Sequence, residues 1–171
     1  MKQKQGTNNM FIHVLFVVYV YVIVRIILFK FGSVDITFLW YRLNESLQNP
    51  DHIIRQFQTG NLIPFDEISK ITHGGMSTHG LINLLGNVAI FIPYGILLGV
   101  MLRNKKVSCA DVFILSFGLS LLLESAQAVL AIGIFDIDDL ILNSTGGLLG
   151  FIFLKLFAST IPISRVVGDR P

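Results

Sequence analysis

The sequence predicts an all-α polytopic membrane protein with four transmembrane helices and an outer interfacial segment between the first two. Composition and hydropathy favour this class. Hydrophobic residues make up 53% of the 171 residues and charged residues only 14%, whereas soluble domains carry about 25% charged residues. The mean hydropathy is +0.69. Because each span needs roughly 20 apolar residues, the length suits one membrane domain over residues 1–171.

Four apolar stretches are long enough to cross a bilayer, at residues 10–29, 81–102, 110–131 and 138–157. The first is longer than the roughly 7–15 apolar residues of a signal peptide, and no small-residue cleavage site follows it. We therefore expect an uncleaved first helix. The four stretches leave too little of the chain to cover them from water, which excludes buried helices of a soluble domain.

The distribution of Lys and Arg predicts that both termini are cytoplasmic. Four spans place the termini on the same side as the 103–109 loop, and these segments carry seven basic residues. The opposite side, formed by residues 31–80 and the turn at 132–137, carries three: Arg42, Arg55 and Lys70. Basic residues concentrate in cytoplasmic segments.

The long outer segment, residues 31–80, mixes apolar and acidic residues and includes Trp40 and Tyr41. Tryptophan and tyrosine favour the head-group level, and an amphipathic stretch can lie in the plane of the interface. The end of the segment, residues 71–80, is rich in Gly, Ser and Thr, which indicates a mobile connection.

Net charge and cysteine content exclude two further classes of protein. The net charge of +2 is too small to indicate a nucleic-acid partner. The single cysteine, Cys109, excludes an internal disulfide framework and a cysteine-based zinc site.

Polar side chains occupy narrow faces of the predicted third and fourth spans. At about 100° per residue, the third span places Ser116, Ser120, Glu124 and Gln127 within an arc of about 80°. If the fourth helix extends back to residue 136, a similar arc holds the set Asp136, Asp139, Asn143, Gly146 and Gly150, whereas Asp138 points the other way.

These faces meet at one depth. Asn83 and Asn87 begin the second span one turn apart, and Glu124 with Gln127 ends the third on the same outer side. The carboxylates and carboxamides therefore gather in the outer half of the membrane, about 5–15 Å below the interface. Interhelical hydrogen bonding, worth about 0.6–2 kcal/mol per residue, is the alternative interpretation. The shared depth favours a functional site instead.

Two interpretations of Arg25, near the outer end of the first span, stay open. Its side chain snorkels to the interface, or it is the counter-charge of Glu124 or Asp139 and donates to a phosphate or carboxylate ligand. The Gly95/Gly99 and Gly146/Gly150 pairs have a simpler role, because the G-x-x-x-G spacing permits close helix approach.

Four strings in order carry a family resemblance: Asn61-Leu-Ile-Pro-Phe65; Asn83-x-x-x-Asn87-x-x-x-Phe-x-Pro-x-Gly95; Glu124-x-x-Gln127; and Phe135-Asp-Ile-Asp-Asp-x-x-x-Asn143-x-x-Gly146-Gly147-x-x-Gly150. Together they resemble the VanZ-like family over nearly the whole chain, up to about Phe157. The chain departs from the family at Gly133, where many members carry an arginine. A role of that arginine falls here to Arg25 or to an arginine of the outer segment.

The resemblance implies a bacterial multi-pass protein of the cytoplasmic membrane. The resemblance also implies that it is related to an accessory protein that raises resistance to the lipoglycopeptide antibiotic teicoplanin. Drugs of this class act outside the cytoplasmic membrane on a lipid-linked cell-wall precursor, so the resemblance implies a role in the cell envelope and agrees with a polar site that opens outward.

Two functions remain open. The first is an enzyme that modifies an outer-leaflet phosphate-linked lipid or a lipid-linked cell-wall precursor, with Glu124 as general base and a possible Mg²⁺ or Ca²⁺ ion on Asp136 and Asp139. Its hydrogen-bond donors to phosphate would be Asn83, Asn87, Gln127 and Asn143. The second is a non-catalytic membrane module that binds a lipid or a lipoglycopeptide. A transporter is less favoured, because no inverted repeat is present.

Overall fold

The computed structural model describes residues 2–29, 35–66, 69–70, 78–103 and 106–160. Within these residues the protein is all-helical, with six helices and an isolated backbone bridge between Asn61 and Asp136. Four helices are long and apolar enough to span a membrane, over Met10–Phe29, Gly80–Met101, Cys109–Val129 and Ile137–Ala158. The predicted fold class is confirmed, and each span ends within two residues of its predicted limits.

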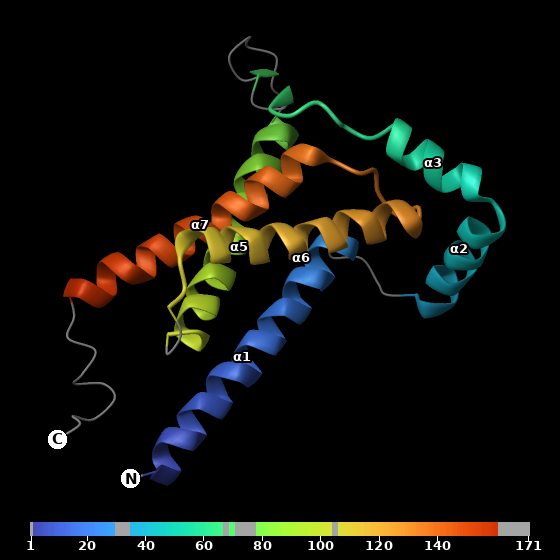
Figure 1. Ribbon diagram of the computed structural model, residues 1–171. Helices are drawn as coiled ribbons and strands as arrows, with labels where there is room; N and C mark the ends of the chain where they lie inside the picture. Colours follow the sequence, from blue (N-terminus) through green and yellow to red (C-terminus); the bar gives the residue numbers. More distant parts are fainter. Residues whose placement is uncertain (1, 30–34, 67–68, 71–77, 104–105, 161–171) are drawn as a thin grey trace.

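The four long helices are α1 (Lys2–Phe29), α5 (Thr78–Met101), α6 (Cys109–Val129) and α7 (Ile137–Thr160). Figure 1 shows the beginning of α1, the connection from α5 to α6 and the end of α7 on one side of the molecule. The short helices α2 (Ile36–Gln48) and α3 (Pro50–Gln58) and the turn from α6 to α7 lie on the opposite side. We call this opposite side the outer side; its extracellular location remains a prediction.

Helices α5 and α7 form the most extensive helix pair, and glycines bring their backbones together. A Cβ atom at Gly95 would collide with the backbone carbonyl of Gly147, and one at Gly146 with the carbonyl of Val88. Without those carbon atoms the helices approach closely and gain van der Waals contact, the main source of helix association in lipid. The predicted close approach at these glycines is confirmed.

The apolar core lies where the four long helices cross. Its fully buried side chains include Ile23 of α1, Phe91 of α5 and Val112 of α6. The first part of α1 projects beyond this core, so that Met10 and Phe11 are more than 60% exposed. Apolar side chains of this kind match the hydrocarbon of a bilayer.

Local capping explains where several helices begin. Ser108 and Asp111 form a reciprocal capping box at the start of α6, and the Asp35 side chain accepts the Phe38 N–H at 3.0 Å at the start of α2. Each such cap contributes about 1 kcal/mol. Helix α2 exposes Trp40 and Tyr41, the residues expected at the interface. Residues 71–77 of the predicted mobile connection lie outside the described residues.

Candidate functional site

A tight turn after α6 brings the start of α7 back against the end of α6. Ala131 has a left-handed backbone (φ 48°), and the Ile132 N–H donates to the Gln127 carbonyl at 3.1 Å, which closes the C-terminus of α6. The chain then returns so that the Asp136 N–H donates to Oε2 of Glu124 at 3.1 Å. The Glu124 side chain is only 1% exposed. The turn thus holds a buried carboxylate against the beginning of α7.

Asp136 caps α7 with its own side chain. Its Oδ1 accepts the Asp138 N–H at 2.8 Å, which satisfies one of the amide groups that a helix start leaves without partners. Burial raises the pKa of Asp136 above its ordinary value, and the neighbouring Asp138 charge raises it further, while hydrogen bonds from Asn61 and from the Asp138 and Asp139 amides oppose the rise. Asp136 is therefore protonated more easily than an exposed aspartate.

The first turns of α5 contribute two carboxamides on the other side of α7. Nδ2 of Asn87 and Nδ2 of Asn83 both donate to Oδ1 of Asp139, the latter at 3.4 Å. Asn83 is exposed, whereas Asn87 and Asp139 are half-buried. Asn83 is therefore the residue of this group that lies most at the surface.

Like α6 and α5, the segment after α3 contacts the start of α7. Asn61 pairs with the residues around Asp136 through its backbone: its N–H donates to the Phe135 carbonyl at 2.9 Å, and its carbonyl accepts the Ile137 N–H at 2.9 Å. Its side-chain Nδ2 donates to Oδ1 of Asp136 at 3.0 Å and to Oδ2 of Asp138 at 3.4 Å. Asn61 therefore links the outer segment to two carboxylates at the start of α7.

Phe65 reinforces this docking. Its backbone is left-handed (φ 66°), a conformation that costs a residue other than glycine roughly 1–2 kcal/mol. The Phe65 N–H donates to Oδ1 of Asp138 at 2.5 Å, and Asp138 is 1% exposed. A hydrogen bond to a charged acceptor is worth about 1.5–3 kcal/mol, enough to offset the strained backbone.

The deeper polar residues contact different partners. Nδ2 of Asn143 donates to Oγ of Ser120 at 2.8 Å, whereas its buried Oδ1 has no hydrogen-bond partner among the residues that the structure describes. Nε2 of Gln127 donates to the Ile27 carbonyl of α1 at 2.8 Å. The guanidinium of Arg25 lies over the Phe29 ring, 5.7 Å from its centroid. The first two contacts tie α6 to α7 and to α1, whereas the third lies within α1.

The structure thus brings together five of the eight site residues expected from the sequence: Glu124, Asp136, Asp139, Asn83 and Asn87. Together with Asn61 and Asp138 we call them the outer polar site. Asn143 and Gln127 lie on the expected buried faces but bond to Ser120 and to α1. Arg25 stacks on its own helix.

Sequence reasoning left Asn61 and Asp138 out of the candidate site. Asp138 does point away from the face that Asp136 and Asp139 were expected to share, but it points toward the outer segment and is buried by it. The available signal was the string Asn61-Leu-Ile-Pro-Phe65, whose first and last residues are those that bond to Asp138.

The possible Mg²⁺ or Ca²⁺ site on Asp136 and Asp139 gains no third acidic, histidine or cysteine ligand among the described residues. Among them no group of three or more His, Cys, Asp or Glu side chains converges as metal ligands would. Asp136 caps α7, and Oδ1 of Asp139 accepts from Asn83 and Asn87.

Arg42 of the outer segment lies beside the turn that contains Gly133. Its Nη2 donates to the Ala131 carbonyl at 3.2 Å, and its Nη1 pairs with Oε2 of Glu45 at 3.3 Å. Arg42 therefore bonds to Ala131, which precedes by two residues the position, Gly133, where many family members are expected to carry an arginine.

Comparison with known proteins identifies the family. The sequence profile of the VanZ/LLP1 family matches residues 16–158. Protein VanZ of Enterococcus faecium is 34% identical over 123 residues, which cover 71% of this chain and 67% of that protein. No solved structure matches the chain. The chain therefore belongs to the VanZ family.

Proposed function

We propose that this VanZ-family membrane protein acts from the outer side on a phosphate-linked lipid of the outer leaflet or on a lipid-linked cell-wall precursor. The observation that carries the proposal is the outer polar site itself. It holds a buried carboxylate, Glu124, against the start of α7, where the exposed Asn83 and the half-buried Asn87 donate to Asp139. Ionisable residues inside membrane spans are costly and usually serve a function.

The proposed chemistry is transfer at phosphorus with Glu124 as general base. Its carboxylate takes the proton of an attacking water or alcohol, whose oxygen forms a bond to phosphorus while the phosphorus–oxygen bond to the leaving group breaks. The proton then passes from Glu124 to the leaving oxygen.

The carboxamides would hold the phosphate group. Asn83 and Asn87 donate to Asp139, and phosphate oxygens would replace that carboxylate as their acceptor. Donors aimed at oxygens that gain charge stabilise the transition state of such a transfer. Through this site the protein would alter the lipid targets of lipoglycopeptides, which connects it to the resistance role implied by its family.

A non-catalytic binding module is the second candidate. The hydrogen bonds from Asn83 and Asn87 to Asp139 favour it, because a carboxylate and its donors that satisfy one another form a stable surface without any reaction. In this case the same group would fix the head of a lipid or a lipoglycopeptide while the apolar part stays in the membrane.

One substitution, Glu124→Gln, separates the two candidates, because glutamine keeps the shape and accepts the Asp136 N–H but cannot act as a base. We compare the lipids, the cell-wall precursors and the teicoplanin susceptibility of cells that express wild type, Glu124→Gln or no protein. Asp51→Asn, at an exposed position of α3, is the control for the loss of one charge.

If the protein is an enzyme, cells that express Glu124→Gln should match cells without the protein in both lipid profile and susceptibility, although Glu124→Gln is present at the same level as wild type. A binding module predicts identical profiles in all strains and retained resistance in Glu124→Gln. If wild type changes neither lipids nor susceptibility relative to cells without the protein, both candidates fail.

A further inference from the structure

The segment after α3 carries a run of apolar side chains that the protein leaves exposed. Leu62 is 52% exposed, Ile63 68% and Phe65 54%, and Pro64 is exposed as well. We call residues 61–65 the outer loop. Consecutive apolar residues are unfavourable on a loop in water, and an exposed apolar patch of this kind marks a surface that contacts a partner or a membrane.

Backbone hydrogen bonds fix the beginning of the outer loop at the start of the fourth membrane span. The Asn61 N–H donates to the Phe135 carbonyl, and the Asn61 carbonyl accepts the Ile137 N–H, both at 2.9 Å. Ile137 is the first residue of that span. Gly60 permits this approach, because a Cβ atom there would lie 2.3 Å from the Phe135 carbonyl oxygen.

The end of the outer loop is fixed in the same way. The Phe65 N–H donates to Oδ1 of Asp138 at 2.5 Å, and Asp138 is the second residue of the span. Within the loop, the Ile63 N–H donates to Oδ1 of Asn61 at 3.3 Å, and the Asp66 N–H donates to the Ile63 carbonyl at 3.4 Å. Contacts with α7 and within the loop therefore hold the apolar side chains in their exposed positions.

These contacts also set the depth of the loop relative to a bilayer. Each residue extends the chain by at most about 3.6 Å, so the Cα atoms of Leu62 and Ile63 lie within roughly 7 Å of that of Asn61. Asn61 is itself bonded to the first residue of a span. The exposed side chains therefore lie near the boundary between head groups and acyl chains, where amphipathic segments insert apolar side chains about 5–10 Å deep.

We propose that the outer loop is a membrane anchor, whose Leu62, Ile63 and Phe65 side chains insert into the leaflet on the outer side. Lipid contact and the docking of Asn61 on α7 stabilise one another, because the loop is held at this depth only while it is docked. The anchor needs no reaction at the outer polar site, so this inference does not depend on the proposed function.

Tryptophan fluorescence in bilayers tests the insertion. The chain has a single tryptophan, Trp40, so Ile63→Trp or Leu62→Trp is made in a Trp40→Phe background. The full-length protein is reconstituted into phosphatidylcholine vesicles in which part of the lipid carries bromine at a shallow or at a deep position of the acyl chains. Both tryptophans should be quenched strongly, and more by the shallow bromine. Asp51→Trp, at an exposed position of α3, is the control and should be quenched only weakly.

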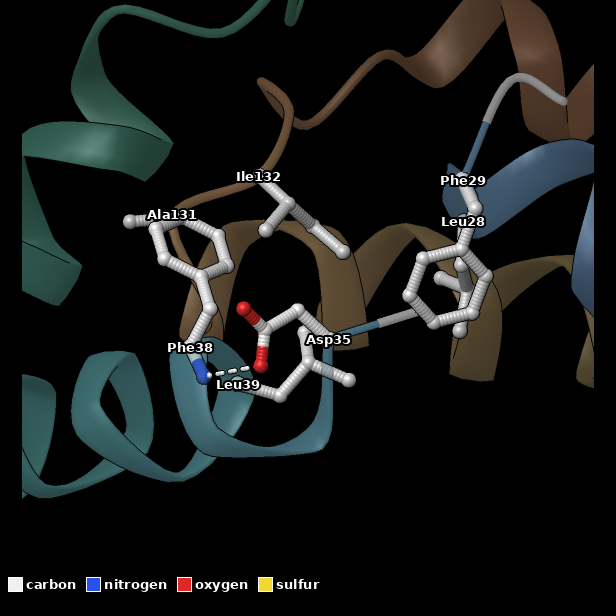
Figure 2. A pocket seen from close by; sticks show the side chains of 7 residues that line it. All are labelled: Leu28, Phe29, Asp35, Phe38, Leu39, Ala131 and Ile132. Carbon is white, nitrogen blue, oxygen red and sulfur yellow. Dashed lines mark hydrogen bonds between the residues drawn. The ribbon is translucent and has the colours of Figure 1, made fainter. Parts of the chain in front are cut away.

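Amide hydrogen exchange in vesicles without bromine tests the coupling between lipid contact and docking. Ile63→Asn keeps the backbone hydrogen bonds of the loop but removes an apolar side chain. The Asn61 and Ile137 amides should then lose protection by about tenfold, as expected when part of the burial of one isoleucine is lost. The control, Ile36→Asn, removes a 76% exposed isoleucine from the start of α2, where the Asp35 cap shown in Figure 2 remains. It should leave both amides unchanged.

The proposal is overturned if Ile63→Trp and Leu62→Trp are quenched no more than Asp51→Trp, because the loop would then face water. Stronger quenching by the deep bromine also overturns it, because the loop would then lie inside the hydrocarbon and not at its boundary. Equal protection of both amides in wild type and Ile63→Asn overturns the coupling. A thermal melt shows whether Ile63→Trp retains its fold, and Leu62→Trp decides the question if it does not.

Discussion

Replacing Asn61 by alanine should release the outer segment from the start of α7. The alanine keeps both backbone hydrogen bonds of the Asn61–Asp136 bridge but loses the side-chain donor, which lies 3.0 Å from Oδ1 of Asp136 and 3.4 Å from Oδ2 of Asp138. The longer contact contributes little, so we count one hydrogen bond to a carboxylate, about 2 kcal/mol. The equilibrium between docked and released segment should therefore shift about 30-fold.

Amide hydrogen exchange measures this shift directly. If exchange occurs through local opening, the Asn61 and Ile137 amides, which donate across the bridge, should lose protection by about 30-fold. Asn49→Ala is the matched control, because Asn49 caps α3 without any side-chain hydrogen bond. Equal protection in wild type and Asn61→Ala, or equal losses in both variants, would refute the argument and leave the backbone bridge as the source of docking.

Three further predictions concern packing, pH and topology. Gly95→Leu should destabilise the protein by about 3 kcal/mol or more in a thermal melt, because the new side chain meets the Gly147 backbone. The control Gly118→Leu should have little effect, because nothing lies within 4 Å of the Cβ position of Gly118. The folded-state pKa of Asp136 is raised, so the contribution of Asp136 to stability is greatest at acidic pH and is lost as the pH rises through the raised value. The melting temperature of wild type should therefore fall relative to that of Asp136→Asn above about pH 4. Equal pH profiles of the two melting temperatures would contradict this. Cys109 is exposed at the end of the predicted cytoplasmic loop, so a membrane-impermeant maleimide should label it only after cells are permeabilised; labelling of intact cells would reverse the topology.

The sequence predicted the membrane spans and their buried faces well, because both depend on short-range properties. A membrane span is one continuous run of apolar residues, so its limits can be located along the sequence. The 3.6 residues per helical turn place Ser116, Ser120 and Glu124 on one side of the helix. All three are buried in the structure. Close helix packing at the glycine pairs could also be predicted from the sequence, because glycines four residues apart in spanning helices permit the backbones to approach closely.

The sequence by itself therefore determined the fold class, the spans and the level at which carboxylates and carboxamides gather. Only the tertiary structure decided how they are connected. The left-handed turns at Ala131 and Phe65 bring Asp136 to Glu124 and the Phe65 amide to Asp138. Residues other than glycine rarely adopt that conformation, and the bridge at Asn61 joins segments 75 residues apart. No periodicity along a single helix encodes contacts of this kind, because they depend on where separate segments meet after folding.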